Sequence, residues 1–165
     1  TRHGRQSATA SAVGFSPDLR FVHQKGRTAM PVTIHESLAR RLHTEEVIWL
    51  TTVRPDGSPV PTPVWFYWNG ESFLIYTQPG SHKLRHIAQN PAVALNFNTD
   101  EGGGSVAVFF GTAGVDDQPP SAVEVEAYFT KYAAGIQMIG LTRETMAAEY
   151  STVLRVHPTR VRTMD

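Results

Sequence analysis

The sequence predicts a mainly β protein of the α+β class, an antiparallel β-barrel with helices around it. Two observations carry this prediction. Runs rich in β-branched and aromatic residues, separated by turn residues, fill the middle of the chain. Helical patterns lie at the ends and in one connection, so strands and helices do not alternate as they do in a doubly wound sheet. This order favours an antiparallel barrel.

Length and charge limit the range of functions. The 165 residues favour one domain, and fifteen basic residues balance fifteen acidic ones. A chain with zero net charge has no overall field for nucleic acid or a membrane surface, so any anion site must be local. Cysteine is absent, which excludes disulfides, thiolate nucleophiles and zinc–cysteine sites. No apolar run approaches the roughly 18 residues of a membrane span, and a reducing cytoplasm is the expected compartment.

The first 29 residues differ from the rest. They are basic, rich in Ser, Ala and Gly, and without sustained periodicity, and they end just before Met30. They lack the apolar core of a secretory signal. We expect residues 1–29 to be a leader or flexible arm outside the fold, and residues 30–165 to form the domain.

The first predicted element is an amphipathic helix over residues 34–45. Thr33 and Glu36 have the spacing of a capping box, in which each side chain satisfies a free backbone donor of the other residue. An apolar stripe follows at i, i+4 and i+8, formed by Ile34, Leu38 and Leu42.

Three strands are predicted next, as a meander over residues 47–54, 60–68 and 72–77. Residues 55–58, with the sequence PDGS, and the pair Asn69-Gly70 supply the two turns. Proline recurs at every second position of the second strand, so the missing N–H groups lie along one edge. Normal pairing is blocked there, at Pro59, Pro61 and Pro63.

The remaining elements follow from the same signals. Asn90-Pro91 ends a helix over residues 82–90, and Ser121 and Thr142 are the expected caps of two later helices. Pro158 is expected to break the last strand. In order, the later elements are strands 92–99 and 105–116, helices 119–134 and 142–151, and strand 152–164.

The segment IYTQPGSHKLRHIAQNP, residues 75–91, concentrates donors at a strand-to-helix junction. Unpaired N–H groups and the helix dipole favour an anion at a helix start. Lys83 and Arg85 add full charges that match a phosphate, and Thr77 and Ser81 add hydroxyl groups. Together these residues predict a phosphate site, with Thr77, Ser81 and Lys83 around the phosphate. The alternative is that Ser81 is only a helix cap and that Lys83 and Arg85 form a solvated helix face.

The segment PVPTPVWFYW gives a second candidate site. Strand alternation places Trp65 and Tyr67 on one face and Phe66 and Trp68 on the other. These rings can stack on a planar ligand or simply fill the barrel core. The proline-blocked edge favours a ligand, since its free carbonyl and few N–H groups can bind the polar edge of a heterocycle.

Other chemistry finds little support. His82 and His86 lie four residues apart on the helix after the junction, but no carboxylate stands at a matching spacing, so we expect exposed imidazoles and no metal site. A G-x-S-x-G elbow and a dinucleotide fingerprint are both absent, which argues against a covalent hydrolase.

Several segments in order resemble one family. WLTTVRPDGSPVPTPVWF, YTQPGSHKLRHIAQNPAVALNF, GTAGV, YFTKYAAGIQMIGLT and LRVHPTRVR are similar to the pyridoxamine 5′-phosphate oxidase-like flavin/deazaflavin oxidoreductases. The similarity covers Met30 to Asp165 and is greatest to the actinobacterial branch that uses coenzyme F420. Additional basic residues of the classical pyridoxamine phosphate oxidases are not found, which argues against oxidation of vitamin B6.

The resemblance implies a split β-barrel homodimer with a cofactor at each subunit interface. It places Thr77, Ser81 and Lys83 at the phosphate, and Thr62, Pro63, Val64 and Trp65 beside the isoalloxazine or deazaflavin ring. Tyr132, Gln137 and Met138 are the candidates for the contribution of the partner subunit. Arg155 is expected to pair with an acidic neighbour in a structural role.

The implied function is an F420-dependent oxidoreductase that transfers hydride from the reduced deazaflavin to an electron-poor organic acceptor. The cofactor carries the reaction, so no catalytic residue of the chain is nominated. FMN is the alternative cofactor on the same fold. A non-catalytic cofactor carrier or haem-binding protein is the alternative of another class, with His82, His86 or His157 as axial ligand.

Overall fold

The computed structural model describes residues 32–164, so the predicted leader at residues 1–29 lies outside the described residues. The helices are α1 (Glu36–Thr44), α2 (His82–Gln89), α3 (Ala122–Lys131), α4 (Ala133–Met138) and α5 (Arg143–Glu149). The strands are β1 (Val47–Val53), β2 (Pro59–Trp65), β3 (Tyr67–Trp68), β4 (Phe73–Thr77), β5 (Ala92–Asn96), β6 (Val106–Val115) and β7 (Thr152–Met164).

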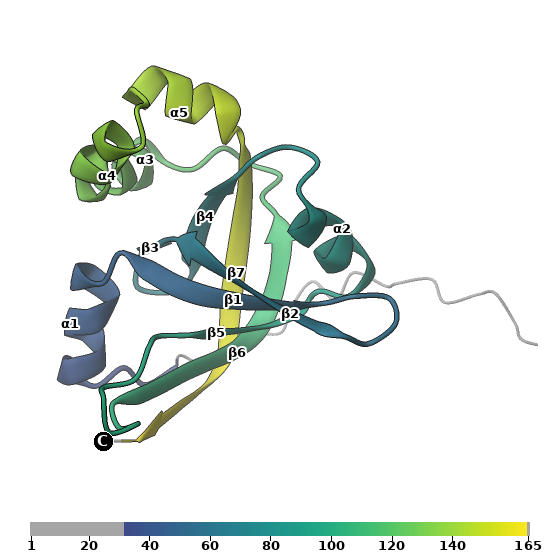
Figure 1. The fold of residues 1–165 in the computed structure, drawn as a ribbon, viewed down its shortest axis with the longest axis vertical. Helices are drawn as coiled ribbons and strands as arrows, with labels where there is room; N and C mark the ends of the chain where they lie inside the picture. The colour runs from purple at the N-terminus through teal and green to yellow at the C-terminus, as the bar shows by residue number, and fades with distance from the viewer. Residues whose placement is uncertain (1–31, 165) are drawn as a thin grey trace, which may run out of the picture.

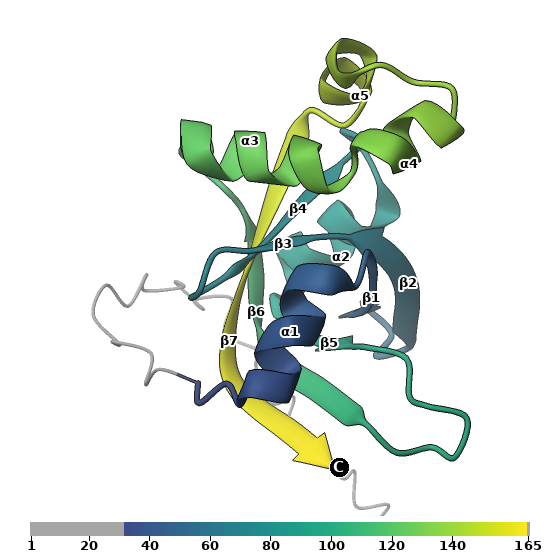
Figure 2. The same ribbon diagram turned by 90° about the vertical axis from the view of Figure 1, so that its left-hand side faces the viewer.

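Seven antiparallel strands form one curled sheet in the order β2-β1-β5-β6-β7-β4-β3 (Figure 1). The predicted mainly β architecture, a split barrel with peripheral helices, is confirmed. Helices α3, α4 and α5 gather at one end of the sheet, and α1 lies at its side (Figures 1 and 2). No helix among residues 32–164 is long and apolar enough to cross a membrane.

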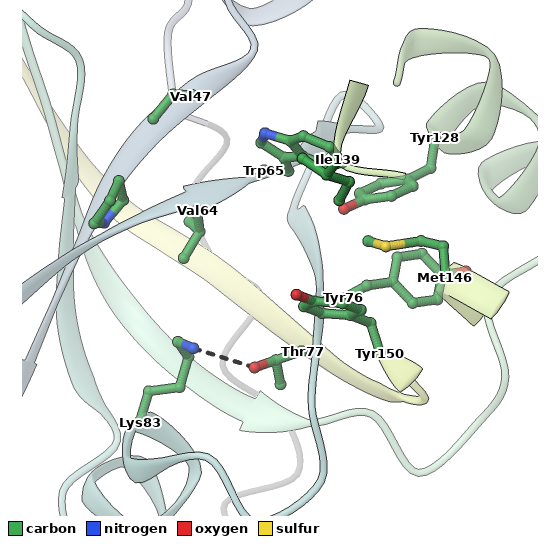
Figure 3. A pocket seen from close by; sticks show the side chains of 11 residues that line it. Val47, Val64, Trp65, Tyr76, Thr77, Lys83, Tyr128, Ile139, Met146 and Tyr150 are labelled. Carbon is green, nitrogen blue, oxygen red and sulfur yellow. Dashed lines mark hydrogen bonds between the residues drawn. The ribbon is translucent and has the colours of Figure 1, made fainter. Parts of the chain in front are cut away.

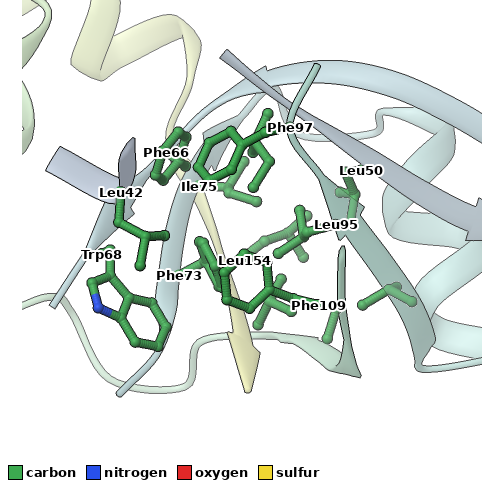
Figure 4. Packing of buried hydrophobic residues seen from close by; sticks show 14 of the residues in the cluster. Leu42, Leu50, Phe66, Trp68, Phe73, Ile75, Leu95, Phe97, Phe109 and Leu154 are labelled. Carbon is green, nitrogen blue, oxygen red and sulfur yellow. The ribbon is translucent and has the colours of Figure 1, made fainter. Parts of the chain in front are cut away.

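Two apolar clusters hold the fold together. The first fills the barrel (Figure 4). Strand alternation in β1 turns Ile48 and Leu50 inward to it. The second lies between the sheet and helices α3 to α5, around Leu74 and Tyr128. The predicted alternation of the aromatic strand is confirmed, because Phe66 and Trp68 enter the first cluster while Trp65 and Tyr67 pack on the second.

The predicted three-strand meander is wrong. β1 and β2 form one hairpin and β3 and β4 another, but the two hairpins lie at opposite ends of the strand order. The predicted strand 60–68 is interrupted at Phe66, whose N–H and C=O both bond to the Tyr132 hydroxyl at 2.8 Å. This side chain satisfies the backbone where the ladder stops, so the chain can cross from one end of the sheet to the other.

Helix starts were predicted with mixed success. Ser121 caps α3 with Glu124 and Thr142 caps α5 with Thr145, as expected. The capping box at Thr33 is wrong, because α1 begins only at Glu36 and its N-cap, His35, makes no side-chain bond. The predicted helix 119–134 is divided at Tyr132 into α3 and α4.

The last strand is not broken at Pro158. β7 runs through this residue, and the pairing with β6 shifts register between Phe110 and Gly111. Thr159 is the extra residue, so the irregularity is a β-bulge rather than a strand end. Gly111 permits the close approach, because a Cβ atom there would lie 2.2 Å from the His157 carbonyl oxygen.

Candidate functional site

A pocket of about 370 Å³ opens between the free edge of β2 and the end of β4 (Figure 3). It lies where the barrel stays split, because β2 and β4 belong to opposite ends of the strand order. Its lining comes from both strands, from Val47 at the start of β1, from Lys83 of α2, and from α3, α5 and the residues that follow α4 and α5. The lining residues are Val47, Pro63, Val64, Trp65, Tyr76, Thr77, Lys83, Tyr128, Ile139, Met146 and Tyr150.

The prolines give the free edge of β2 an unusual character. Alternate residues of an antiparallel strand turn N–H and C=O together toward one neighbour or the other. Proline has no N–H, so the bonds to β1 fall to the residues between the prolines, and the proline carbonyls face the free edge. The first three outward positions, Pro59, Pro61 and Pro63, therefore offer acceptors only. Trp65 follows at the next outward position and restores one N–H donor.

The structure brings Thr77, Ser81 and Lys83 together, as the sequence of the strand-to-helix junction predicts. Lys83 Nζ donates to Thr77 Oγ1 at 3.2 Å, and Thr77 Oγ1 donates to Ser81 Oγ at 3.2 Å. The turn that joins β4 to α2 produces this arrangement, with Ser81 as the N-cap residue of α2. The Ser81 hydroxyl makes no capping bond to the helix, which leaves it facing Thr77 rather than its own backbone.

Lys83 brings a charge into a half-buried position. Burial lowers the pKa of its ammonium group. Within residues 32–164 no carboxylate lies in ion-pair range of Lys83, and its hydrogen-bond partner is the neutral, buried Thr77. An ammonium group with partial burial and no counter-ion is suited to an anionic ligand group.

Trp65 forms the wall of the pocket on the β2 side. Its ring stacks on Tyr132, with centroids 4.6 Å apart and planes inclined by 6°. Gly135 of α4 allows this contact, because a Cβ atom there would come within 3.0 Å of the indole. Tyr132 is completely buried in its own chain, so its predicted role in the pocket of a partner subunit is wrong. Gln137 and Met138 are exposed on α4, and their partner role stays a prediction.

Four large side chains of the pocket were missed by the sequence reasoning. Tyr76 precedes Thr77 in β4, and the others arrive from α3, α5 and the residue after α5. Burial raises the pKa of both Tyr76 and Tyr128. Of the four, only Tyr76 could have been found from the sequence, because it directly precedes Thr77 of the predicted phosphate site. The other three are Tyr128, Met146 and Tyr150.

The remaining predicted site residues divide into two groups. Thr62 does not line the pocket, and it pairs with Leu50 of β1. Ser81 also stays out of the lining but contacts Thr77. Pro63, Val64, Trp65, Thr77 and Lys83 all line the pocket.

The charged and imidazole side chains outside the pocket have structural roles or face solvent. Arg155 pairs with Asp116 and Glu124, so its predicted structural role is confirmed. Arg85 and His82 contact each other on the exposed face of α2. His86 is not exposed as expected, because it is half-buried and its Nδ1 lies 2.9 Å from the buried Thr52 hydroxyl.

A family profile and a curated relative of this chain both point to the same protein family. Residues 34–165 match the profile of the family described as pyridoxamine 5′-phosphate oxidase. The pyridoxine/pyridoxamine 5′-phosphate oxidase of Rubrobacter xylanophilus is 36% identical over 104 residues, which are 62% of this chain and 46% of that protein. The chain thus spans about half the length of this curated relative.

Solved structures share the fold at lower identity. A conserved hypothetical protein of Mycobacterium tuberculosis superposes with a TM-score of 0.63 and 20% identity, over 86% of this chain and 89% of that one. An F420 reductase superposes with a TM-score of 0.59 and 24% identity, over 78% and 98% of the two chains. Because the family profile covers most of the sequence and the split barrel agrees with it, this chain belongs to the pyridoxamine 5′-phosphate oxidase family.

Proposed function

We propose that the protein is an F420-dependent oxidoreductase acting on an electron-poor organic acceptor. The observation that carries this proposal is the half-buried ammonium group of Lys83, which has no carboxylate partner within residues 32–164 and bonds to Thr77. This group lies at one end of the pocket, and the polar edge of β2 borders the same pocket. The end of the pocket at Lys83 thus suits a phosphate, and the side of the pocket along β2 suits a flat heterocycle.

The residues fit each part of such a cofactor. Lys83, Thr77 and Ser81 offer a charge and two hydroxyls to the phosphate. The pyrimidine part of a flavin or deazaflavin ring alternates carbonyl groups with N–H. It is complementary to an edge on which the Pro63 carbonyl accepts and the Trp65 N–H donates. When bound, the reduced deazaflavin supplies hydride from its ring C5, while the protein holds the ring and shields one face.

The open turn before α2 supports F420 over FMN. Coenzyme F420 carries an oligoglutamate tail beyond its phosphate, and this tail must leave the pocket. Gln78, Pro79 and Gly80 are all exposed beside Ser81 and Lys83, so the phosphate end opens to solvent. A similar fold in an F420 reductase agrees with this choice. FMN remains the second candidate, since it presents a phosphate to the same three residues.

A homodimer with the cofactor at the interface is part of the proposal. Val47 and Ile139 line the pocket yet are 39% and 52% exposed, and Met138, the residue before Ile139, is 86% exposed. Apolar side chains exposed around a binding pocket suit coverage by a second subunit. The lining of this pocket does not favour haem, because it contains none of the candidate ligands His82, His86 and His157.

A cofactor titration tests the proposal. Purified protein is titrated with F420, followed by its fluorescence, and separately with FMN, followed by flavin fluorescence. Reduced F420 is then incubated with electron-poor organic acceptors and its reoxidation is recorded. Saturable binding of F420 with acceptor-dependent oxidation is expected. Binding of FMN alone would support the second candidate, and F420 bound without turnover of any acceptor would support a carrier.

A further inference from the structure

The hydroxyl group of Tyr128 is buried without a hydrogen-bond partner among residues 32–164. The residue is 0% exposed, and its ring belongs to the second apolar cluster. In Figure 3 the hydroxyl oxygen lies at the end of the ring away from α3, on the side of Trp65 and Ile139, both of which line the pocket. A buried hydroxyl without a partner costs roughly 1 to 3 kcal/mol, so its position calls for an explanation.

Tyr132, one helical turn after Tyr128, is a buried tyrosine whose hydroxyl group has a structural role. The Tyr132 hydroxyl contacts Phe66 N, Phe66 O and Glu46 O, all at 2.8 Å. The two rings are neighbours, with centroids 4.8 Å apart. The fold therefore satisfies one hydroxyl completely and leaves the other turned toward the pocket.

The surroundings of the Tyr128 hydroxyl are aromatic and aliphatic. Tyr76 packs edge-on against its ring at 4.6 Å, and Trp65, Ile139 and Met146 complete this part of the pocket. Lys83 and Thr77 lie toward the opposite end (Figure 3). Burial, and then the neighbouring tyrosines, raise the pKa of Tyr128, so its phenol stays protonated at neutral pH and has a proton to share.

We propose that Tyr128 is a specificity-determining residue whose hydroxyl donates a hydrogen bond to an oxygen of a flat, otherwise apolar acceptor substrate. The class of ligand follows from the walls, because aromatic and thioether side chains favour a flat apolar body and a single polar group selects one oxygen. This inference rests on the proposed function, since the acceptor must lie in the pocket that also holds the cofactor ring.

The test uses a matched pair of probes that differ in one carbonyl group, 1-tetralone and tetralin. Their affinities for the full-length protein are measured by quenching of tryptophan fluorescence, without cofactor and again with saturating F420. The parent protein is expected to prefer 1-tetralone. Tyr128→Phe should reduce this preference by about 2- to 10-fold, the effect of one neutral hydrogen bond, and should leave tetralin binding unchanged.

A stability measurement separates a ligand contact from a structural one. Removing an unpaired buried hydroxyl is neutral or stabilising, so the melting temperature of Tyr128→Phe should equal or exceed that of the parent. Tyr132→Phe is the matched control, and it should lower the melting temperature by roughly 3 °C or more because it leaves backbone groups unpaired.

Three outcomes would overturn the inference. They are an unchanged ratio of the two probe affinities in Tyr128→Phe, a fall in its melting temperature as large as in Tyr132→Phe, and a loss of F420 affinity in place of 1-tetralone affinity. The cofactor titration reports separately on the proposed function. A changed probe ratio in a protein that binds neither F420 nor FMN would uphold the Tyr128 contact and refute the cofactor assignment.

Discussion

Arg155 holds the carboxylate of Glu124 at 2.5 Å between β7 and the first turn of α3. The same guanidinium group contacts Asp116 at 2.7 Å, and the side chains of Arg155 and Glu124 are both 14% exposed. Glu124 also accepts from the backbone N–H of Ser121 as part of the α3 capping box. This cluster therefore ties the helical end of the molecule to the sheet.

The acid stability of the protein should depend on Glu124. Its hydrogen bond to Arg155 is the main cause that lowers the pKa of Glu124 from 4.5 to about 2. A lowered pKa in the folded state stabilises above pH 4.5, and the contribution is lost as the pH falls from 4.5 to 2. Glu124→Gln should reduce the free energy of unfolding by roughly 2 to 3 kcal/mol at pH 7, and by progressively less toward pH 2.

Urea unfolding of parent and variant between pH 7 and pH 2 measures this effect. Glu126→Gln is the control, because Glu126 pairs with Arg143 on the exposed surface and should behave like the parent. A constant difference between Glu124→Gln and the parent at every pH would contradict the assignment to this carboxylate.

Cofactor affinity should depend on Lys83. Lys83→Ala removes the charged donor that lies 3.2 Å from Thr77, and affinity for F420 or FMN should fall by roughly 1.5 to 3 kcal/mol. Fluorescence titration at fixed ionic strength gives the two dissociation constants. Arg85→Ala serves as the matched control, since Arg85 is exposed on the same helix and outside the pocket lining. Equal losses in both variants would show a general charge effect rather than a phosphate site.

Gly111 should tolerate no side chain. In Gly111→Ala the new Cβ atom meets the His157 carbonyl 2.2 Å away and the Pro158 Cα 2.8 Å away, both of them backbone atoms. The bulge between β6 and β7 must then shift, at a cost of about 1 to 3 kcal/mol in the free energy of unfolding. Gly114→Ala in the same strand has no atom within 4 Å of the new Cβ and should stay close to the parent. Chemical denaturation of both variants distinguishes a local clash from a general intolerance of β6 to side chains.

Features encoded by near neighbours in the sequence were predictable. The inward alternation of Ile48 and Leu50 needs only the strand period, and the Asn69-Gly70 turn needs only its own residues. The three phosphate candidates belong to this class as well, because Thr77 and Lys83 are only six residues apart and a single turn brings their side chains together.

Features that depend on distant contacts were not predictable. The aromatic strand breaks at Phe66 because Tyr132, 66 positions later, supplies its hydrogen bonds. Tyr128 on α3 and Tyr150 directly after α5 reach the pocket because the closure of the whole sheet determines where these helices lie. The wrongly predicted cap at Thr33 has a simpler cause, since the capping-box spacing of Thr33 and Glu36 also occurs here, where the helix starts at Glu36, two residues later than predicted.

The proline run in β2 also protects the surface of the protein. A strand edge with free donors and acceptors is a template for pairing with another chain, and this is a common origin of aggregation. Pro59, Pro61 and Pro63 remove three successive donors from the edge that the split barrel leaves unpaired. The sheet can therefore keep one strand edge unpaired for a ligand while strand pairing with another molecule at this edge is disfavoured.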